Sequence, residues 1–518
     1  MGHVTPLTAS DPRSSTVDDV LRRSAARHPD RAALVFGADD PVTWTYAELD
    51  TAVTHAARAL RGLGLARGDR VAAYGKNSDA YVVGYLACAR AGLVHVPVNF
   101  ALTGGELAYL VEQSGARAVL VDPALRGQYD AAGLAVEHVL PLRDEPGSLL
   151  ELARTPGDGP VLPDGEDPVA DTELVQLLYT SGTTSRPKGA MMTHRALVHE
   201  YVSAIAALDL RADDDPLHPM PLYHSAQMHV FLLPYLAVGA TNHLVETPDV
   251  ATCLRVVEER RLGALFLAPT VWVPLAGHPD LATRDLASLR KAFYGASIMP
   301  VPVLQRLQAA LPDLGFYNCF GQSEIGPLAT VMRPEEHADR PDSCGRPVLF
   351  VELRVLDEHG ADVAPGEQGE VVYRSPQLCV GYWENPEATA EAFRDGWFHS
   401  GDLVRIDAEG FITVVDRIKD VINTGGVLVA SREVEDAIYT HPDVAEVAVV
   451  GTPDERWIEA VTAFVVRRDG ATVDADALVA HARERLAGFK TPKHVRFVDE
   501  LPRNASGKLL KRVLRDDA

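Results

Sequence analysis

Residues 179 to 189, YTSGTTSRPKG, combine hydroxyl side chains, two glycines and one lysine in a single short stretch. A loop of this composition that follows a strand can direct backbone N–H groups and side-chain donors into one concavity, which suits a phosphate group. The stretch is not a Walker A loop, because Pro187 stands where that motif has its second glycine after Gly182. A solvated surface loop is the alternative, and the stretch alone does not separate the two.

Four later segments also contain residue types that could do chemistry. The segment FYGAS ends in small residues, and NCFGQSE offers an aromatic ring, an amide, a hydroxyl and a carboxylate. WFHSGDLVRIDAEGFITVVDRIKD contains Asp402 and Arg417, and LPRNASGKLLKR places Lys508 on a loop that contains glycine. Taken alone, FYGAS would be an ordinary core strand, Asp402 an exposed residue in a turn and Lys508 a solvated charge, and NCFGQSE would be a weak signal. Their combination calls for elements that bring them together.

Helices and strands of similar length alternate along the first part of the chain. Thr45 and Glu48 form a capping box that predicts a helix over residues 45–64. The segments that continue this order are a strand at 70–75, a helix at 78–92, a strand at 93–98, a helix at 104–115 and a strand at 116–122. Such alternation predicts a largely parallel sheet with helices on both faces.

The pattern changes past about residue 345, where short strands are separated by turn residues. This change predicts an antiparallel, barrel-like part over about residues 345–416. A smaller α/β unit follows. We therefore expect an α/β protein with a large N-terminal domain, residues 1–418, that contains helix-covered parallel sheets and the small barrel-like subdomain. A small α/β C-terminal domain, residues 419–518, completes the chain.

The 518 residues carry a formal net charge of −23. Such an acidic protein repels nucleic acids and anionic membranes, so we expect neither as a partner. The five cysteines are scattered without metal-ligand spacing, which favours a reduced, cytoplasmic setting without structural zinc. The N-terminus lacks the features of a signal peptide, and no run of about 18 apolar residues exists to span a bilayer, so we expect no stable membrane insertion.

In their order along the chain, these segments resemble the motifs of the adenylate-forming superfamily. That superfamily comprises acyl-CoA synthetases, firefly-luciferase-type enzymes and the adenylation domains of nonribosomal peptide synthetases. The resemblance extends from about Tyr46 to Lys508 and implies an acid:CoA ligase that uses ATP, Mg²⁺ and CoA. The residues that it implies for ATP binding are Thr180, Ser181, Gly182, Thr183, Thr184, Lys188, Gly295, Ala296, Ser297, Asn318, Phe320, Gly321, Gln322, Asp402 and Arg417.

The resemblance also implies a role for individual residues. The loop from Thr180 to Lys188 closes over the β- and γ-phosphates, although Ser185 replaces a usual glycine. Gly295, Ala296 and Ser297 lie along the adenine, Phe320 stacks on it, and Asn318 faces its amino edge. Asp402 accepts both ribose hydroxyls, which suits a carboxylate because it offers only acceptors, and Arg417 also reaches the ribose.

Three catalytic residues follow from the same match. Ser323 donates to the α-phosphate and Glu324 holds Mg²⁺. Lys508 bridges the attacking carboxylate and an α-phosphate oxygen, where its charge stabilises the anionic transition state. No nucleophilic side chain is needed, because the carboxylate itself attacks the α-phosphorus.

The C-terminal domain is implied to turn about a hinge at Lys419 between two half-reactions. Gly425 and Gly426 would then line the channel for the pantetheine arm of CoA. Val427, Leu428 and residues 430–432 depart from the usual GGENIYPAE-like run of the family. An alternative therefore stays open, in which a stand-alone adenylating enzyme hands its acyl-AMP to a carrier protein or a partner ligase.

Another alternative is a catalytically silent nucleotide-binding or scaffold protein. Retention of Lys188, Glu324, Asp402, Arg417 and Lys508 argues against it. The stretch from residue 483 to 515 holds ten Lys or Arg against three Asp or Glu. This basic stretch could receive the 3′-phosphate of CoA or an acidic carrier protein, or it could simply be a solvated face.

The acyl pocket is expected between the phosphate loop and the adenine strand. Its candidate residues are His224, Gln227, Val230, Trp272 and Gly295, with His224 near the substrate carboxylate. Plain core packing is the alternative for the buried types among them. No Asp occurs in HSAQMHVFLL to pair with a substrate amine, which disfavours an α-amino acid. We expect a small-molecule hydrophobic carboxylic acid, whether fatty, aryl or polycyclic.

Overall fold

The computed structural model describes residues 14–157, 160–162, 165–180, 186–297, 299–425, 427–454, 456–503 and 509–516. Within this part, the chain forms two compact units. The first contains residues up to 180, 187–352 and 374–393, and the second contains residues 353–373 and those from 394 onward. None of the helices in the described ranges has the length and apolar character that a membrane span requires.

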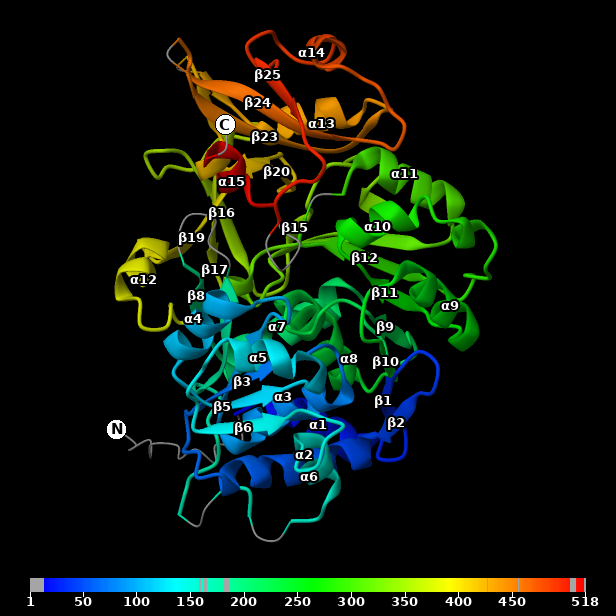
Figure 1. Ribbon diagram of the computed structural model, residues 1–518, viewed down its shortest axis with the longest axis vertical. Helices are drawn as coiled ribbons and strands as arrows, with labels where there is room; N and C mark the ends of the chain where they lie inside the picture. The colour runs from blue at the N-terminus through cyan, green and yellow to red at the C-terminus, as the bar shows by residue number, and fades with distance from the viewer. Residues whose placement is uncertain are drawn as a thin grey trace, which may run out of the picture. The chain divides into compact units, whose positions relative to one another are not determined.

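A six-stranded sheet in the first unit has the order β6-β5-β3-β4-β7-β8. Figure 1 shows its strands β6, β5 and β3 side by side. Its strands are β3 (Arg70–Tyr74), β4 (Val94–Val98), β5 (Ala116–Val121), β6 (His138–Pro141), β7 (Leu174–Thr180) and β8 (Lys188–Thr193). All neighbours are parallel except β7 and β8, which are antiparallel. These pairings confirm the largely parallel sheet that the alternation predicted. Its central strands are almost entirely buried, as is usual for a parallel sheet that is covered on both faces.

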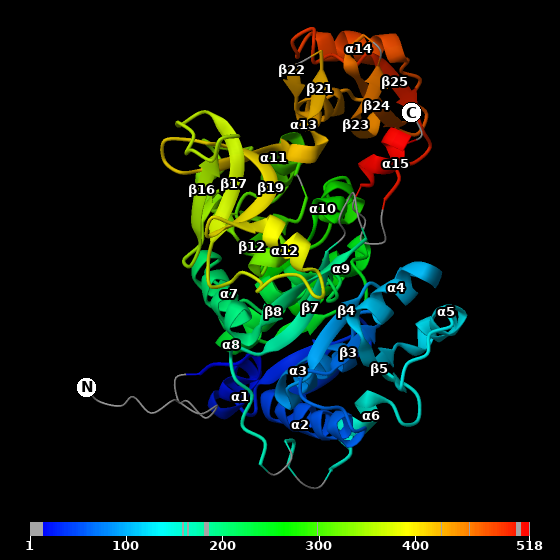
Figure 2. The ribbon, with the colours of Figure 1, turned by 90° about the vertical axis from the view of Figure 1, so that its left-hand side faces the viewer.

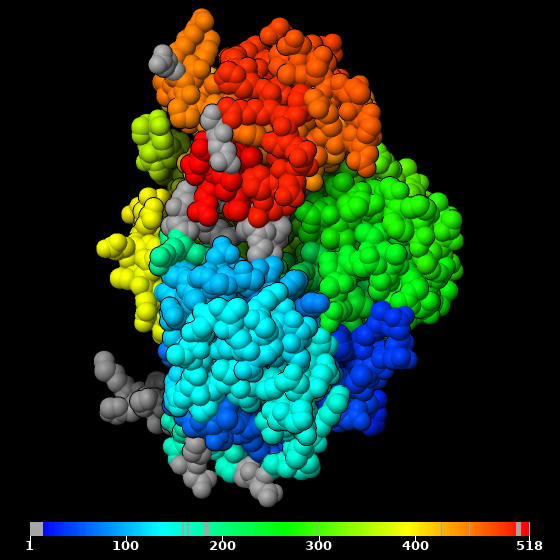
Figure 3. All heavy atoms as spheres, viewed as in Figure 1, coloured from blue at the N-terminus to red at the C-terminus, as the bar shows by residue number. Residues whose placement is uncertain are grey.

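A nine-stranded sheet in the same unit has the order β15-β14-β13-β12-β11-β9-β10-β1-β2. Its strands are β1 (Ala32–Phe36), β2 (Val42–Thr45), β9 (Pro216–His218), β10 (Asn242–Leu244), β11 (Ala264–Phe266), β12 (Lys291–Gly295), β13 (Gly315–Phe320), β14 (Thr330–Met332) and β15 (Arg346–Pro347). The central strands are parallel and the outer ones antiparallel. A shared core packs the stretch from α9 to β13 as one body, green in Figure 3.

Several helices of the first unit begin where a side chain caps the first turn. Thr45 accepts a hydrogen bond from the N–H of Glu48, whose carboxylate accepts from the N–H of Thr45, so the expected capping box is present. The helices are α1 (Val17–Arg27), α2 (Tyr46–Gly62), α3 (Asp79–Ala91), α4 (Gly104–Ser114), η1 (Pro123–Leu125), α5 (Arg126–Ala131), α6 (Leu149–Arg154), α7 (His194–Ala207), η2 (Ala226–Leu232), α8 (Leu233–Val238), α9 (Val250–Arg260), α10 (Pro269–Leu275), η3 (Pro279–Ala282), α11 (Val301–Ala310), η4 (Ser323–Ile325), η5 (Pro334–Glu336) and α12 (Pro386–Ala392).

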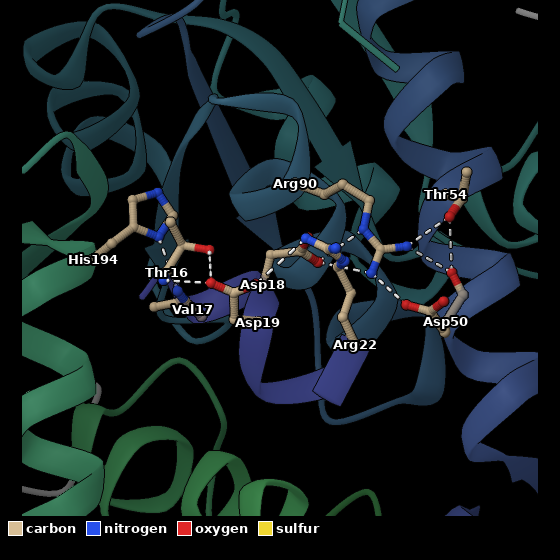
Figure 4. A network of polar contacts seen from close by, with 9 residues as sticks. All are labelled: Thr16, Val17, Asp18, Asp19, Arg22, Asp50, Thr54, Arg90 and His194. Atoms are coloured by element: carbon tan, nitrogen blue, oxygen red, sulfur yellow. Dashed lines mark hydrogen bonds and ion pairs between the residues drawn. The ribbon is translucent and has the colours of Figure 1, made fainter. Parts of the chain in front are cut away.

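A polar network fastens α1 to the rest of the first unit (Figure 4). The guanidinium of Arg90 on α3 lies 2.7 Å from a carboxylate oxygen of Asp18 on α1 and also binds Asp50 and Thr54 on α2. The N–H of Val17 donates to Nδ1 of His194, the first residue of α7, at 3.1 Å. The network therefore connects α1 with α7, the helix that directly follows β8.

The pH dependence of stability should reflect His194. Its Nδ1 accepts a hydrogen bond, so the ring is neutral in the fold, and burial lowers its pKa from 6.5 to about 4. Because the folded pKa lies below the unfolded one, this stabilisation is complete above pH 6.5 and is lost as the pH falls toward 4. The full effect is roughly 3 kcal/mol.

Thermal unfolding midpoints between pH 7.5 and pH 4.5 check this expectation. In His194→Asn the side-chain oxygen can still accept from Val17 and no longer titrates, so the midpoint should fall less steeply with acidification. His359→Asn, at an exposed site, is the control and should keep the wild-type slope. An unchanged slope in His194→Asn would contradict the assignment.

The second unit begins with a five-stranded sheet in the region of the expected barrel-like part, and its strand β19 pairs antiparallel with β17 and β20. Figure 2 shows β16, β17 and β19 of this sheet running side by side. Its strands are β16 (Glu352–Leu356), β17 (Gln368–Arg374), β18 (Phe393–Arg394), β19 (Trp397–Ile406) and β20 (Ile412–Arg417). Strand β20 pairs with β19 and leads into the short turn η6 (Ile418–Asp420).

The rest of the second unit is a small α/β layer. Its sheet contains β21 (Ile422–Thr424), β22 (Val427–Val429), β23 (Val444–Asp454), β24 (Ile458–Arg467) and β25 (His494–Phe497). Its helices are α13 (Ser431–Tyr439), α14 (Ala475–Arg483) and α15 (Lys511–Asp516). Apolar side chains of α13, α14 and the strands form its core.

Candidate active site

The two strands on either side of the expected phosphate loop, β7 and β8, are an antiparallel pair. Thr180 ends β7, Lys188 begins β8, and the two residues are direct partners across the pair. Ser181, Gly182, Thr183 and Thr184, which the resemblance assigns to the phosphates, lie outside the described residues. The pairing brings Thr180 and Lys188 together at the end of β7 and the start of β8.

A segment from far along the chain lies against this pair of strands. The N–H of Val380 donates to the carbonyl of Met191 on β8, and the N–H of Trp383 donates to the carbonyl of Gly189. This pairing places the ring of Tyr382 under the ammonium of Lys188, 5.3 Å from the ring centroid. A cation in this position is attracted by the negative face of the ring.

Tyr382 also reaches the residue expected to hold the metal. Its hydroxyl donates to Oε1 of Glu324 at 3.0 Å, and the carbonyl of Glu324 accepts from the N–H of Cys379 at 2.7 Å. The same side chain therefore links Lys188 to the expected metal ligand. No motif in the sequence points to this role, because Tyr382 lies outside the segments that predicted the site.

The turn that carries the catalytic candidates is held by polar contacts on both sides. The hydroxyl oxygens of Ser323 and Ser225 are 2.9 Å apart, and Ser225 directly precedes η2. Among the described residues, Nε2 of Gln322 is buried without a hydrogen-bond partner. An orphaned donor of this kind fits a site that receives a polar ligand.

The strand ends expected along the adenine are adjacent in the nine-stranded sheet. Gly295 ends β12 beside Cys319 of β13, and a Cβ at Gly295 would lie 2.1 Å from the carbonyl oxygen of Cys319. The close packing of β12 against β13 therefore requires glycine at this position, whether or not an adenine binds beside it. Ala296 follows with φ of 63°, a conformation that costs energy for a residue with a side chain and is concentrated at functional sites.

Two other adenine candidates, Asn318 and Phe320, lie on β13, and Ser297 is exposed after β12. The amide nitrogen of Asn318 donates to the carbonyl of Ser343 at 2.9 Å, which fixes the orientation of the side chain. Gly321 follows in close contact with the backbone, since a Cβ there would lie 2.0 Å from the carbonyl oxygen of Pro327. These residues form one continuous edge in the first unit.

The ribose candidates form a pair in the second unit. Asp402 on β19 and Arg417 on β20 are partners across the antiparallel strands, and Nε of Arg417 lies 3.3 Å from a carboxylate oxygen of Asp402. A carboxylate paired with a guanidinium in this way can only accept further hydrogen bonds. This is the chemistry that two vicinal hydroxyl groups require.

Most of the acyl-pocket candidates are buried side chains. Gln227 accepts from the N–H of Met220, and its amide nitrogen lies 2.8 Å from Nδ1 of His218. The indole N–H of Trp272 donates to the carbonyl of Phe293, and Val230 is buried on η2. The segment η2 is a π-helix, a form that occurs often at functional sites. His224 lies just before it and is less buried.

The C-terminal candidates are described in part. Lys419 is exposed in η6, and Gly425 adopts φ of 65° in the turn between β21 and β22, beside the ring of Trp457. Gly426 and Lys508 lie outside the described residues. Their predicted roles, the CoA channel and the catalytic lysine, stay predictions.

A family model described as AMP-binding enzyme matches residues 21–383, and a second, described as AMP-binding enzyme C-terminal domain, matches residues 433–508. The chain belongs to the family of AMP-binding enzymes. This AMP-binding enzyme is 40% identical over 471 residues to a feruloyl-CoA synthase of an Amycolatopsis species, which covers 91% of the chain and 93% of the relative.

Two further relatives agree with this assignment. A 3-[(3aS,4S,7aS)-7a-methyl-1,5-dioxo-octahydro-1H-inden-4-yl]propanoyl:CoA ligase of Mycobacterium tuberculosis is 37% identical over 513 residues, 97% of this chain and 98% of that one. The solved structure of ATP-bound MatB from Rhodopseudomonas palustris matches with a TM-score of 0.86 and 32% identity, over 97% of this chain and 99% of that one.

The comparisons confirm the α/β fold and the resemblance to acyl-CoA synthetases of the adenylate-forming superfamily. They also confirm the expected class of this AMP-binding enzyme, an acid:CoA ligase that forms an acyl-adenylate and uses ATP and CoA. CoA as the acceptor is thereby supported over the carrier-protein alternative. The roles of the individual site residues stay predictions.

Proposed function

We propose that this acid:CoA ligase activates ring-bearing hydrophobic carboxylic acids. The adenylation step of this proposal rests on the joined set of Lys188, Tyr382 and Glu324, in which Glu324 lies in the turn η4 that follows β13. The set contains no nucleophilic side chain poised by a base. It therefore suits a reaction in which the substrate carboxylate is the nucleophile.

The first half-reaction forms a bond between a carboxylate oxygen of the acid and the α-phosphorus of ATP. The bond from the α-phosphorus to the bridging oxygen of the β-phosphate breaks, and pyrophosphate leaves with the electron pair. Thr180 and Lys188, which are partners across β7 and β8, would hold the departing phosphates. Ser323 would donate to the α-phosphate once its hydroxyl turns from Ser225.

The second half-reaction transfers the acyl group to CoA. The thiol sulfur attacks the carbonyl carbon, the bond to the phosphate oxygen breaks, AMP leaves, and the thiol proton passes to solvent. We propose the domain limits expected from the sequence, with residues 1–418 and 419–518 joined at Lys419, so that the C-terminal part can turn between the two half-reactions.

Mg²⁺ fits the residues present at Glu324. Among the described residues, no group of three or more acidic, His or Cys side chains forms a complete metal cage. Mg²⁺ is usually bound through one or two carboxylates together with substrate phosphates, so the single carboxylate of Glu324 is an appropriate donor set. When bound with ATP, the ion would neutralise charge that builds up on the phosphates.

Ring-bearing acids are favoured by the relatives and by the surroundings of η2. The names of two relatives describe an aromatic acid and a bicyclic acid as substrates. In this chain, Phe231 of η2 stacks on Phe266 with ring centroids 4.4 Å apart and lies 4.9 Å from Phe293. No acidic side chain occurs in η2 to bind a substrate amine. An apolar, aromatic environment of this kind suits a ring rather than an amino acid.

The five cysteines are free and buried. Free thiols persist in reducing compartments, so we propose a cytoplasmic location.

A panel of carboxylic acids, assayed for pyrophosphate release with and without CoA, tests the proposed function. We expect aryl-propenoic and bicyclic acids to show kcat/KM at least about tenfold above straight-chain acids of equal carbon number. Equal or better turnover of the straight-chain acids would contradict the substrate class. Accumulation of acyl-AMP without thioester in the presence of CoA would contradict the ligase activity itself.

Replacing Tyr382 by phenylalanine tests the link between Lys188 and Glu324. The change keeps the ring under the ammonium and removes only the hydroxyl that donates to Glu324. We expect the Mg²⁺ concentration for half-maximal pyrophosphate exchange to rise about tenfold, because a hydrogen bond to a charged group is lost. Tyr382→Leu, which removes the ring as well, should additionally raise KM for ATP. An unaltered Mg²⁺ requirement in Tyr382→Phe would contradict the role of the hydroxyl.

A further inference from the structure

The two residues that begin α13 distinguish this chain from the usual run of its family. In the GGENIYPAE-like run, proline and alanine occupy the positions at which this chain has Ser431 and Arg432. Both of these residues bind β20, the strand that precedes the hinge turn η6. Ser431 and Arg432 therefore form contacts that the usual proline and alanine could not form.

Ser431 makes two hydrogen bonds to the same carboxylate oxygen. Its backbone N–H donates to Oδ2 of Asp416 at 2.6 Å, and its hydroxyl donates to that oxygen at 2.7 Å. Both residues are buried, so water does not compete strongly for these bonds. A proline at position 431 could make neither bond, because it has no N–H and no hydroxyl.

Arg432 adds a second connection to the same strand. Its guanidinium donates to the carbonyl of Val414 on β20 and lies 3.6 Å from Asp436, one turn further along α13. An alanine at position 432 could not reach β20. The first turn of α13 is thus fastened to β20 at two points, Asp416 and Val414.

A buried ion pair extends the connection to α15. The ammonium of Lys511 lies 2.8 Å from Oε1 of Glu435 and 2.5 Å from the hydroxyl of Ser431. Burial lowers the pKa of Lys511, but Glu435 and Asp416 outweigh it, so the pKa is raised and the side chain stays charged. Arg515 of the same helix pairs with Asp420 at 2.8 Å.

These contacts differ in their place relative to the hinge. Glu435, Lys511 and Arg515 all follow Lys419, so a turn at Lys419 can carry them as one body. Asp416 and Val414 precede it, whereas Ser431 and Arg432 follow it. A rotation at the hinge must therefore separate Ser431 from Asp416 and Arg432 from Val414, while the pair of Lys511 and Glu435 can stay intact.

We propose that Ser431 and Arg432 are positioning residues that fasten α13 to β20 and restrain rotation at Lys419. They act on the reaction through the hinge and not through substrate. The consequence for turnover rests on the proposed function, whereas the restraint itself is a property of the second unit. Opening of the contacts to Asp416 and Val414 is then a step that the protein must take between its two half-reactions.

The chain allows the contacts to be removed without loss of the helix. Ser431 is the first residue of α13, a position that tolerates proline because its N–H has no partner within the helix, and Ala430 before it is extended, as a residue before proline prefers. Ser431→Pro together with Arg432→Ala restores the residues that are usual in the family. Ser431→Ala keeps the backbone donor and removes only the hydroxyl. Asp476→Asn, at an exposed position in the first turn of α14, is the matched control.

Hydrogen exchange of the full-length protein without ligand measures the restraint directly. In Ser431→Pro/Arg432→Ala, we expect peptides that cover residues 412–424 to exchange on the order of tenfold faster than in the wild type. Ser431→Ala should lie between the two, and Asp476→Asn should match the wild type. Equal exchange in the double variant and the wild type would overturn the proposal.

The two half-reactions supply the second measurement. Pyrophosphate exchange reports adenylation alone, whereas thioester formation with CoA requires the rotation in every cycle. We expect the ratio of thioester turnover to adenylation to rise several-fold in the double variant, because the contacts that oppose rotation are absent. An unchanged or lower ratio overturns the proposal even where exchange is faster. Absence of adenylation in the wild type would instead refute the proposed function and leave the exchange result valid.

Discussion

Replacing Lys508 by alanine is expected to lower the rate of acyl-adenylate formation by about 10² to 10³. The predicted role of its ammonium is to balance charge at the α-phosphorus while the carboxylate attacks and pyrophosphate leaves. A preorganised positive charge accelerates the reaction most when the negative charge that it stabilises develops only in the transition state. Acid-dependent exchange of labelled pyrophosphate into ATP measures this half-reaction without CoA.

The same variant should retain the second half-reaction. If the C-terminal domain turns between the two half-reactions, Lys508 has no task while CoA attacks the acyl-adenylate. Lys508→Ala supplied with preformed acyl-adenylate and CoA should therefore make thioester at close to the wild-type rate. Equal loss of both half-reactions would point to a folding defect, and adenylation within tenfold of the wild type would refute the catalytic role.

The sequence was sufficient for elements whose signals are local. The capping box of Thr45 and Glu48 marked the start of α2, and the alternation of apolar strands with amphipathic helices predicted the parallel sheet. Asp402 and Arg417 were chosen from one motif, and β19 and β20 indeed make them partners. Residues close together in sequence needed only the right strand pairing to meet.

Residues far apart in sequence could not be placed in this way. Tyr382 meets Lys188 and Glu324 only because residues 379–383 lie along β8, a contact that no local pattern predicts. Gly295 was chosen for access of an adenine, but its neighbour Cys319 requires the glycine on packing grounds as well. The π-helical form of η2 was not predicted either, because its apolar residues fit any buried helix.

The network around Arg90 should produce a large loss of stability when it is broken. Arg90 and Asp18 have side chains only 9% and 10% exposed, and their ion pair is 2.7 Å long. Burial raises the pKa of Asp18 although Arg90 opposes this shift, so its charge depends on the guanidinium. Arg90→Leu would leave that carboxylate buried without its partner. We expect the free energy of unfolding to fall by about 3 to 5 kcal/mol, measured by urea denaturation.

A double variant separates the unpaired charge from the lost packing. In Arg90→Leu/Asp18→Asn the buried carboxylate is absent, so the loss should be clearly smaller than in Arg90→Leu alone. Arg22→Leu, at an exposed position on α1, is the matched control and should cost little. Equal losses in the single and double variants would show that the guanidinium acts by packing and by its bonds to α2. A larger loss in the single variant, which we expect, means instead that the buried carboxylate of Asp18 on α1 requires the guanidinium of Arg90 on α3 as its partner.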